Sequence, residues 1–171
     1  MVLALPAAAQ DYSFRNYAQA DGLQGLSVST LFEDREGVVW AGTELGLHRF
    51  ERERFEFVGR DAGIDAVYIL GIAEDRQGRL WVASSNGVFV GKDGRFVPVL
   101  RAGRPVAVDR GNTLVADGDG MVLASHQQLL RIDADAAGRW RYTALPLRLA
   151  GEPPLQVGEA LLADGDALWA S

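Results

Sequence analysis

The sequence predicts an all-β fold, an incomplete β-propeller of about three to four blades, each made of four antiparallel strands. The phrase EDREGVVWAGTELG begins at Glu33, and EDRQGRLWVASSNG begins at Glu74, with Glu, Asp, Arg, Gly and Trp at the same offsets 41 residues apart. Short runs of apolar, β-branched and aromatic residues alternate with turns rich in Gly and Asp. No window shows helical periodicity with caps. A repeat of about 42 residues is the size of one propeller blade.

The first two units give the same pattern of strands and turns. Asp34 can accept hydrogen bonds from the backbone ahead of it, and Gly37 accepts a positive φ, so the segment between them is expected to be a turn. The tryptophans Trp40 and Trp81 are expected to pack between blades, because a blade cannot bury both of its faces alone. The strands are expected at 28–33, 38–41, 47–50 and 55–58 in the first unit, and at 69–73, 80–83, 88–90 and 96–100 in the second.

Two weaker copies follow. LVADGDGMVLASHQQLLRI begins at Leu114 and is expected to align Asp117 with Asp75 and Gly120 with Gly78, while LLADGDALWAS begins at Leu161. The expected units are about 14–58, 59–100, 101–145 and 146–171, and since propellers close with about four to eight blades, the chain is expected to be a fragment of a longer polypeptide. The residues with an expected structural role in the repeat are Asp34, Gly37, Trp40, Asp75, Gly78, Trp81, Gly120 and Trp169.

Composition narrows the classes of function. The chain has 171 residues, 48% of them hydrophobic, with a net charge of −6 and a pI near 4.9. This acidic balance argues against nucleic acid as a partner, because binding to phosphates needs basic patches. The chain contains no cysteine, so disulfides, thiolate catalysis and cysteine-ligated metals are excluded.

The N-terminus suggests export. Residues 1–9, MVLALPAAA, are expected to be the truncated tail of a signal peptide, with Ala7 and Ala9 at the −3 and −1 positions of a cleavage site. The alternative is an ordinary disordered N-terminus. On the first interpretation, residues 10–171 are the partial propeller.

The first unit resembles the opening repeat of two-component regulator propellers. The resemblance is specific over residues 14–58, good in the second unit and only in outline in the last two. It implies a non-catalytic periplasmic sensor domain at the N-terminus of a membrane-spanning histidine kinase, hybrid regulator or diguanylate cyclase. The residues that carry it are Phe14, Tyr17, Asp21, Gly22, Leu23, Val28, Asp34, Gly37, Trp40, Gly42, Thr43, Gly46, Leu47, Arg49 and Phe50.

A ligand is expected on one face of the propeller. That face is built from the loops that enter the innermost strands, at 24–27 and 61–68, and from the turns between second and third strands, at 43–45, 84–86 and 125–127. Tyr68 could stack on a sugar ring, and the polar side chains offer hydrogen bonds. The candidate ligand-binding residues are Gln24, Ser27, Thr43, Glu44, Asp65, Tyr68, Ser85, Asn86 and His126. The alternative is that they are ordinary loop residues.

No metal, cofactor or catalytic site is expected. Asp117 begins an acidic turn, but an EF-hand starting there would need Gly where Val122 stands and Glu where Gln128 stands. The two histidines, His48 and His126, fall within a strand and a loop and do not suggest a catalytic triad.

The resulting hypothesis is an N-terminal periplasmic ligand-sensing fragment of a bacterial membrane receptor. Its expected partners are a small extracytoplasmic ligand, such as a carbohydrate, the remainder of the receptor chain, and a second copy in a homodimer. The main alternative is a propeller scaffold for protein–protein interaction. A third hypothesis is a glycan-processing enzyme, which would need a pair of carboxylates at a set separation.

Overall fold

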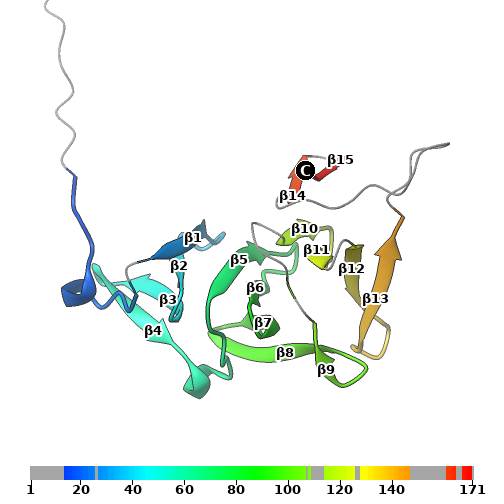
Figure 1. Cartoon of the computed structure of the whole chain (residues 1–171), viewed down its shortest axis with the longest axis horizontal. Helices are drawn as coiled ribbons and strands as arrows, with labels where there is room; N and C mark the ends of the chain where they lie inside the picture. Colours follow the sequence, from blue (N-terminus) through cyan, green and yellow to red (C-terminus); the bar gives the residue numbers. More distant parts are fainter. Residues whose placement is uncertain are drawn as a thin grey trace, which may run out of the picture.

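The computed structural model describes residues 14–25, 27–106, 108, 114–125 and 128–146, and the backbone of 161–164 and 167–170. Its sheets follow one another along an arc, with β1, β5 and β10 on the inner side and β4, β8 and β13 on the outer side (Figure 1). The strands are β1 (Val28–Glu33), β2 (Val39–Thr43), β3 (Gly46–Glu51), β4 (Arg54–Val58), β5 (Ile69–Glu74), β6 (Leu80–Ser84), β7 (Gly87–Lys92), β8 (Arg95–Arg101), β9 (Arg104–Pro105), β10 (Leu114–Asp117), β11 (Gly120–Ser125), β12 (Gln128–Ala134), β13 (Trp140–Leu145), β14 (Leu161–Asp164) and β15 (Ala167–Ala170).

Each sheet is an antiparallel meander in which strands adjacent in sequence are paired. We call β1–β4 blade 1, β5–β9 blade 2 and β10–β13 blade 3; β14 and β15 form a two-stranded sheet. Strand β14 contacts β10, so this last sheet lies next to the inner strand of blade 3. The all-β, incomplete-propeller fold class is therefore confirmed.

A buried or half-buried aspartate organises the turn between the first and second strands of blades 1 and 2. The carboxylate of Asp34 accepts hydrogen bonds from the amides of Glu36 and Val38, at 3.0 and 2.9 Å. Asp75 does the same for the amides of Gln77 and Arg79. Both turns need a left-handed glycine, which is Gly37 in blade 1 and Gly78 in blade 2, with φ of 80° and 74°.

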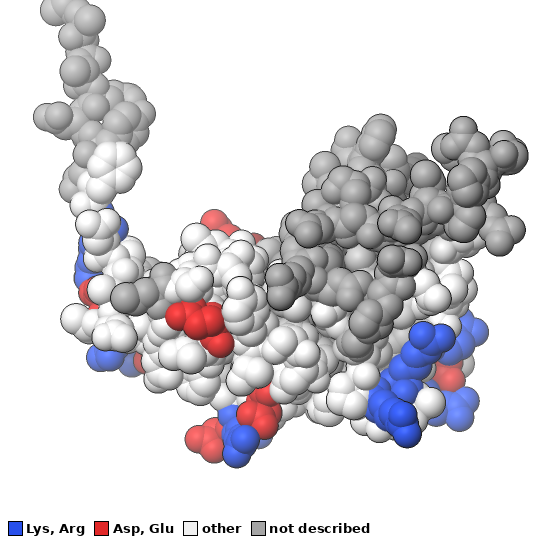
Figure 2. All heavy atoms as spheres, viewed as in Figure 1, with Lys and Arg blue, Asp and Glu red and all other residues white. Residues whose placement is uncertain are grey.

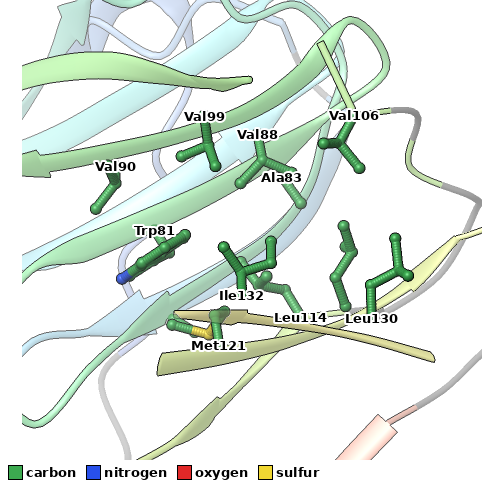
Figure 3. Packing of buried hydrophobic residues seen from close by; sticks show 12 residues of the cluster. Trp81, Ala83, Val88, Val90, Val99, Val106, Leu114, Met121, Leu130 and Ile132 are labelled. Atoms are coloured by element: carbon green, nitrogen blue, oxygen red, sulfur yellow. The ribbon is translucent and has the colours of Figure 1, made fainter. Parts of the chain in front are cut away.

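The second-strand tryptophans pack against the outer strand of the next blade. The ring of Trp40 meets Phe96 of β8 edge-on with centroids 6.3 Å apart, and Trp81 meets Trp140 of β13 at 5.0 Å. Around Trp81, apolar side chains of blade 2 interleave with Met121, Leu130 and Ile132 of blade 3 (Figure 3). The expectation that these tryptophans lie between blades is confirmed.

Neighbouring turns are also bonded to each other. Arg35 in the first turn donates through its backbone amide and its Nε to the carboxylate of Glu74, at 2.9 and 2.8 Å. Arg79 in the second turn donates to the carbonyl of Asp119, at 3.0 Å, in the third. These contacts link blade 1 to blade 2 and blade 2 to blade 3 at one end of the arc.

Blade 3 departs from the expected alignment of the repeat. Its first turn has two residues, Gly118 and Asp119, and Gly118 supplies the left-handed φ of 62°. Gly120 lies instead at the first residue of β11, and Asp117 ends β10 and pairs with Arg131. A shorter hairpin has replaced the aspartate turn, so matching residues at a fixed offset assigned the wrong glycine.

Other features were not expected from the sequence. Two 3₁₀ helices, η1 (Gln19–Asp21) and η2 (Arg60–Ala62), precede blades 1 and 2, and β9 extends blade 2 by a fifth strand. Within the described residues, no helix has the length and apolar character needed to cross a lipid bilayer. The expected signal-peptide tail at 1–9 lies outside the described residues, and of Trp169 only the backbone, in β15, is described.

Candidate functional site

The hairpins between second and third strands close in the same way in blades 1 and 2. The hydroxyl of Thr43 donates to the carbonyl of Gly46 at 3.2 Å or to that of Gln24 at 2.9 Å, and Ser84 donates to the carbonyl of Gly87 at 2.9 Å. Both hydroxyl groups are buried. Thr43 therefore closes its hairpin and is not available to a ligand.

Glu44 connects three loops at the end of blade 1. Its carboxylate accepts a hydrogen bond from the amide of Ser27 at 3.1 Å, and its carbonyl accepts one from the amide of Tyr68 at 3.2 Å. The hairpin of blade 1 thus touches both the loop entering β1 and the loop entering β5. Glu44, Ser27 and Tyr68, which are 41 residues apart at most in sequence, lie together on one face.

In blade 2 the hairpin also bonds to the loop that enters its own first strand, with different side chains. The hydroxyl of Ser85 donates to the carbonyl of Val67 at 2.9 Å, and the amide nitrogen of Asn86 donates to the carbonyl of Asp65 at 2.6 Å. Asp65 itself accepts a hydrogen bond from Arg60 at 3.0 Å, and this contact raises the pKa of the Arg60 guanidinium. Much of the hydrogen-bonding capacity of these side chains is used within the loops.

A buried histidine supports the first of these loops. Nε2 of His48, in β3, accepts a hydrogen bond from the amide of Gln24 at 3.0 Å. The ring is fully buried and packs edge-on against Phe57. Burial lowers the pKa of His48, so the neutral form that can accept this bond is favoured. These contacts give His48 a role in positioning the loop that enters β1.

Exposed aromatic and apolar side chains also lie on this face. Tyr68 is 49% exposed, and the apolar side chains of Leu45 and Val67 beside it are 54% and 47% exposed. Sequence reasoning did not select Leu45 or Val67, since an apolar loop residue does not stand out in a chain that is nearly half hydrophobic. His126, the remaining candidate, lies outside the described residues.

Two cavities lie away from this face. One of about 310 Å³ is lined by Trp40, Arg49 and residues 56–62, and a smaller one of about 130 Å³ adjoins it near the turns of Asp34 and Gly78. None of the candidate ligand-binding residues lines either cavity.

The charged side chains of the described residues do not form a metal-binding site. In Figure 2 the described surface is mostly uncharged, the acidic atoms lie in small separate groups, and most of the basic atoms gather at the lower right, near β9 and β13. Among the described residues, no group of three or more His, Asp or Glu side chains is placed to hold a metal ion.

The repeats that form blades 1 and 2 can be assigned to a family. Residues 22–44 and 63–86 match the family model described as two component regulator propeller. These two segments are two component regulator propeller repeats. The matches cover the loop, the first two strands and the hairpin of each blade, so the family pattern includes the candidate face. No curated protein matches the chain.

Solved structures with the same fold are much longer. The chain is similar to a domain from B. thetaiotaomicron, described as the extracellular domain of the one component system BT4673, with 18% identity and a TM-score of 0.63. It is also similar to the β-propeller domain of Cps50 (Swd1) from Myceliophteria thermophila, with 14% identity and a TM-score of 0.53. These matches cover 84% and 74% of this chain, but the chain spans only 19% and 41% of the two structures. At these identities the similarity shows the fold.

Proposed function

We propose that the chain is part of an extracytoplasmic sensor propeller and binds a small polar ligand, such as a carbohydrate, on the face of Glu44 and Tyr68. The observation that carries the proposal is the hydrogen bond between the backbone amide of Tyr68 and the backbone carbonyl of Glu44, which places an acidic residue of blade 1 next to a residue of blade 2 whose aromatic side chain is exposed. An aromatic ring beside hydrogen-bonding groups suits a sugar, which has apolar faces and a polar rim.

The family of the repeats and the extracellular location of a similar domain support this proposal. The repeats are named for two component regulators, and the BT4673 domain is described as extracellular. The absence of cysteine and the Ala-rich start of the chain are compatible with export to the periplasm. The receptor itself, with a membrane anchor and an output domain, would lie outside these 171 residues.

Signalling would require the ligand to prefer one arrangement of the blades over another. A ligand shifts an equilibrium only by its difference in affinity between two states. Glu44 contacts the loops of two blades, so a ligand held by Glu44 and Tyr68 would be sensitive to the spacing between blades 1 and 2.

The proposal is tested on a glycan array, with the affinity of each hit then measured by calorimetry. We expect Tyr68→Ala and Glu44→Gln each to weaken binding by about tenfold or more, equivalent to about 1.4 kcal/mol. Glu36→Gln is the matched control, because Glu36 lies in the turn at the other end of blade 1. The proposal would be contradicted if Tyr68→Ala and Glu44→Gln bound a glycan as strongly as the unmodified chain does. It would also be contradicted if the unmodified chain bound no glycan on the array.

A second candidate function is a scaffold that binds a protein or peptide on the same face. The observation in its favour is the exposure of Leu45 and Val67 beside Tyr68, since apolar side chains at the surface commonly mark protein contacts. A displayed peptide library would select binders in this case. Leu45→Asp and Val67→Asp should abolish the binding of the selected peptides. Binding of a glycan would depend on Glu44 instead.

A further inference from the structure

The face of blade 1 that packs against blade 2 carries an arginine where blade 2 has a valine. In blade 1, Trp40 of β2 is paired with Arg49 of β3, and in blade 2, Trp81 of β6 is paired with Val90 of β7. Val90 is buried and belongs to the apolar cluster between blades 2 and 3 (Figure 3). Since the repeat folds with valine at this position in blade 2, the fold does not require the charge of Arg49.

The guanidinium group of Arg49 is only partly satisfied by the protein. Its Nη2 pairs with the carboxylate of Glu51 on the same strand. Its Nε is buried, and no atom of the described residues accepts a hydrogen bond from it. A buried donor without an acceptor destabilises a folded chain. The Arg49 side chain is still 37% exposed, so a ligand can reach the guanidinium group.

The two cavities described above meet at this side chain. Trp40, Arg49 and Gly94 line both of them. The larger cavity, of about 310 Å³, extends from Trp40 and Arg49 along β4 and η2, and Gly94 belongs to the turn between β7 and β8. This cavity therefore lies between the outer strands of blade 1 and a turn of blade 2. Its volume is at the lower end of the range for small-molecule sites, about 300–1,000 Å³.

The charged groups of the larger cavity favour a ligand that carries one charge of each sign. Glu56 of β4 is the cross-strand partner of Arg49, so the two side chains lie on the same face of blade 1. Asp61 of η2 is a second carboxylate of the lining. Within the described residues, neither carboxylate is paired with a basic side chain, whereas Arg60 is paired with Asp65 at 3.0 Å. An ammonium group would complement Glu56 and Asp61, and a carboxylate would complement Arg49.

An apolar wall completes the lining of the larger cavity. It consists of Trp40, Val58 and Ala62, which belong to or pack against the hydrophobic cluster between blades 1 and 2. An aliphatic side chain would lose contact with water on this wall. A neutral sugar would meet the charged groups only through its hydroxyl groups, whereas an amino acid matches them with opposite charges. The lining therefore suits an amino acid better than a sugar.

We propose that the cavity between blades 1 and 2 binds a free α-amino acid with an aliphatic side chain, such as leucine. The guanidinium group of Arg49 binds the carboxylate, Glu56 and Asp61 bind the ammonium group, and the apolar wall contacts the side chain. None of the residues of the proposed glycan-binding face lines this cavity, so the two sites are separate and neither proposal depends on the other.

The proposal is tested by adding L-leucine to the isotopically labelled chain and following the indole N–H signal of Trp40 by NMR. We expect a saturable shift of this signal. Two analogues, 3-methylbutylamine without the carboxylate and 4-methylpentanoate without the ammonium group, should each bind about tenfold or more weakly. The absence of a saturable shift at about 10 mM L-leucine would overturn the proposal, as would equal binding of all three compounds. A saturable shift with D-glucose and none with L-leucine would assign the cavity to a neutral sugar instead.

Substitutions separate binding from folding. Arg49→Val introduces the residue that blade 2 has at this position, so the variant should remain folded. It should bind L-leucine about tenfold or more weakly and 3-methylbutylamine as before, because only leucine has a carboxylate to lose its partner. Glu56→Gln should weaken both of these amines without weakening 4-methylpentanoate. Arg141→Val is the matched control, since Arg141 is exposed on β13 and lines neither cavity.

Two results with these variants would overturn the proposal. The first is binding of L-leucine that neither Arg49→Val nor Glu56→Gln weakens, which would place the ligand outside the cavity. The second is an equal loss of L-leucine and 3-methylbutylamine binding in Arg49→Val, which would mean that Arg49 acts on the structure rather than on the carboxylate of the ligand.

Discussion

The indole Nε1 of Trp81 donates a hydrogen bond of 2.8 Å to the fully buried carboxylate of Asp75. The same oxygen also accepts a hydrogen bond of 2.7 Å from Nε of Arg79, while the other oxygen accepts two backbone amides. In blade 1, Trp40 and Asp34 make the same bond, also at 2.8 Å. One carboxylate thus joins the turn of a blade to the side chain that packs against the next blade.

Replacing this carboxylate should strongly destabilise the protein. Asp75→Ala leaves the indole N–H and two turn amides without their acceptor, and we expect a loss of about 3 kcal/mol in the free energy of unfolding. Urea unfolding followed by tryptophan fluorescence measures it. Asp61→Ala is the control, because Asp61 is an exposed aspartate of η2 and its loss should change stability by less than about 0.5 kcal/mol. Similar losses in the two variants would contradict the role given to Asp75.

The tryptophan ring itself should matter more than its hydrogen bond. Trp40 is buried against Phe96, so Trp40→Ala should lower the free energy of unfolding by about 3–5 kcal/mol. Trp40→Phe keeps an aromatic ring but loses the hydrogen bond to Asp34, and we expect it to lower the free energy of unfolding by about 1–2 kcal/mol. Both are measured by denaturant titration. A loss below about 1 kcal/mol for Trp40→Ala would be incompatible with a ring buried between blades.

Two left-handed glycines, Gly63 before blade 2 and Gly103 in the turn between β8 and β9, separate two causes of destabilisation. Gly63→Ala combines a left-handed φ with a methyl group 2.2 Å from the carbonyl oxygen of Phe96. Gly103→Ala has a similar φ of 76° but no atom within 4 Å of the added group. We expect Gly103→Ala to lower the free energy of unfolding by about 1 kcal/mol, from backbone strain alone. Gly63→Ala should lower it by at least about twice that amount. Equal shifts in the midpoint of thermal unfolding would show that the close approach to β8 is relaxed in solution.

His48 predicts a pH dependence of stability. Its pKa is lowered in the folded chain, so between the folded value and about 6.5 the unfolded chain binds a proton that the folded chain does not. Stability should therefore fall as the pH drops through about 6.5 and continue to fall until the folded value is reached. His48→Gln, which can still accept a hydrogen bond from the Gln24 amide, should reduce the difference in urea midpoint between pH 7.5 and pH 5.5. An unchanged difference in His48→Gln would assign the pH dependence to other groups.

The strands of blades 1 and 2 could be predicted from the sequence because their signals are local. The run from Val28 to Glu33 was predicted with its observed bounds, and the other strands differ by one or two residues at their ends. The aspartate turns were also predictable, since Asp34 bonds to amides two and four residues ahead of it. In blade 3 the prediction failed at Gly120, because a two-residue turn removed the spacing on which the alignment depended.

The candidate site was only partly predictable. Sequence position indicated which loops share a face, and the contacts of Glu44 with Ser27 and Tyr68 bring three of the chosen residues together. It could not indicate that Thr43 is buried or that Leu45 is exposed, because both lie in the same short hairpin. Exposure there depends on the neighbouring loops, which come from other parts of the chain.

By itself, the sequence determined the repeat, the strands and the residues that form each blade, since periodicity and turn chemistry act over a few residues. The tertiary structure decided which equivalent positions are buried. Leu31 and Ile72 occupy the same place in the repeat, yet one is 64% exposed and the other 5% exposed. The difference arises because burial depends on the presence of a neighbouring blade, and blade 1 covers β5 while no described blade covers β1.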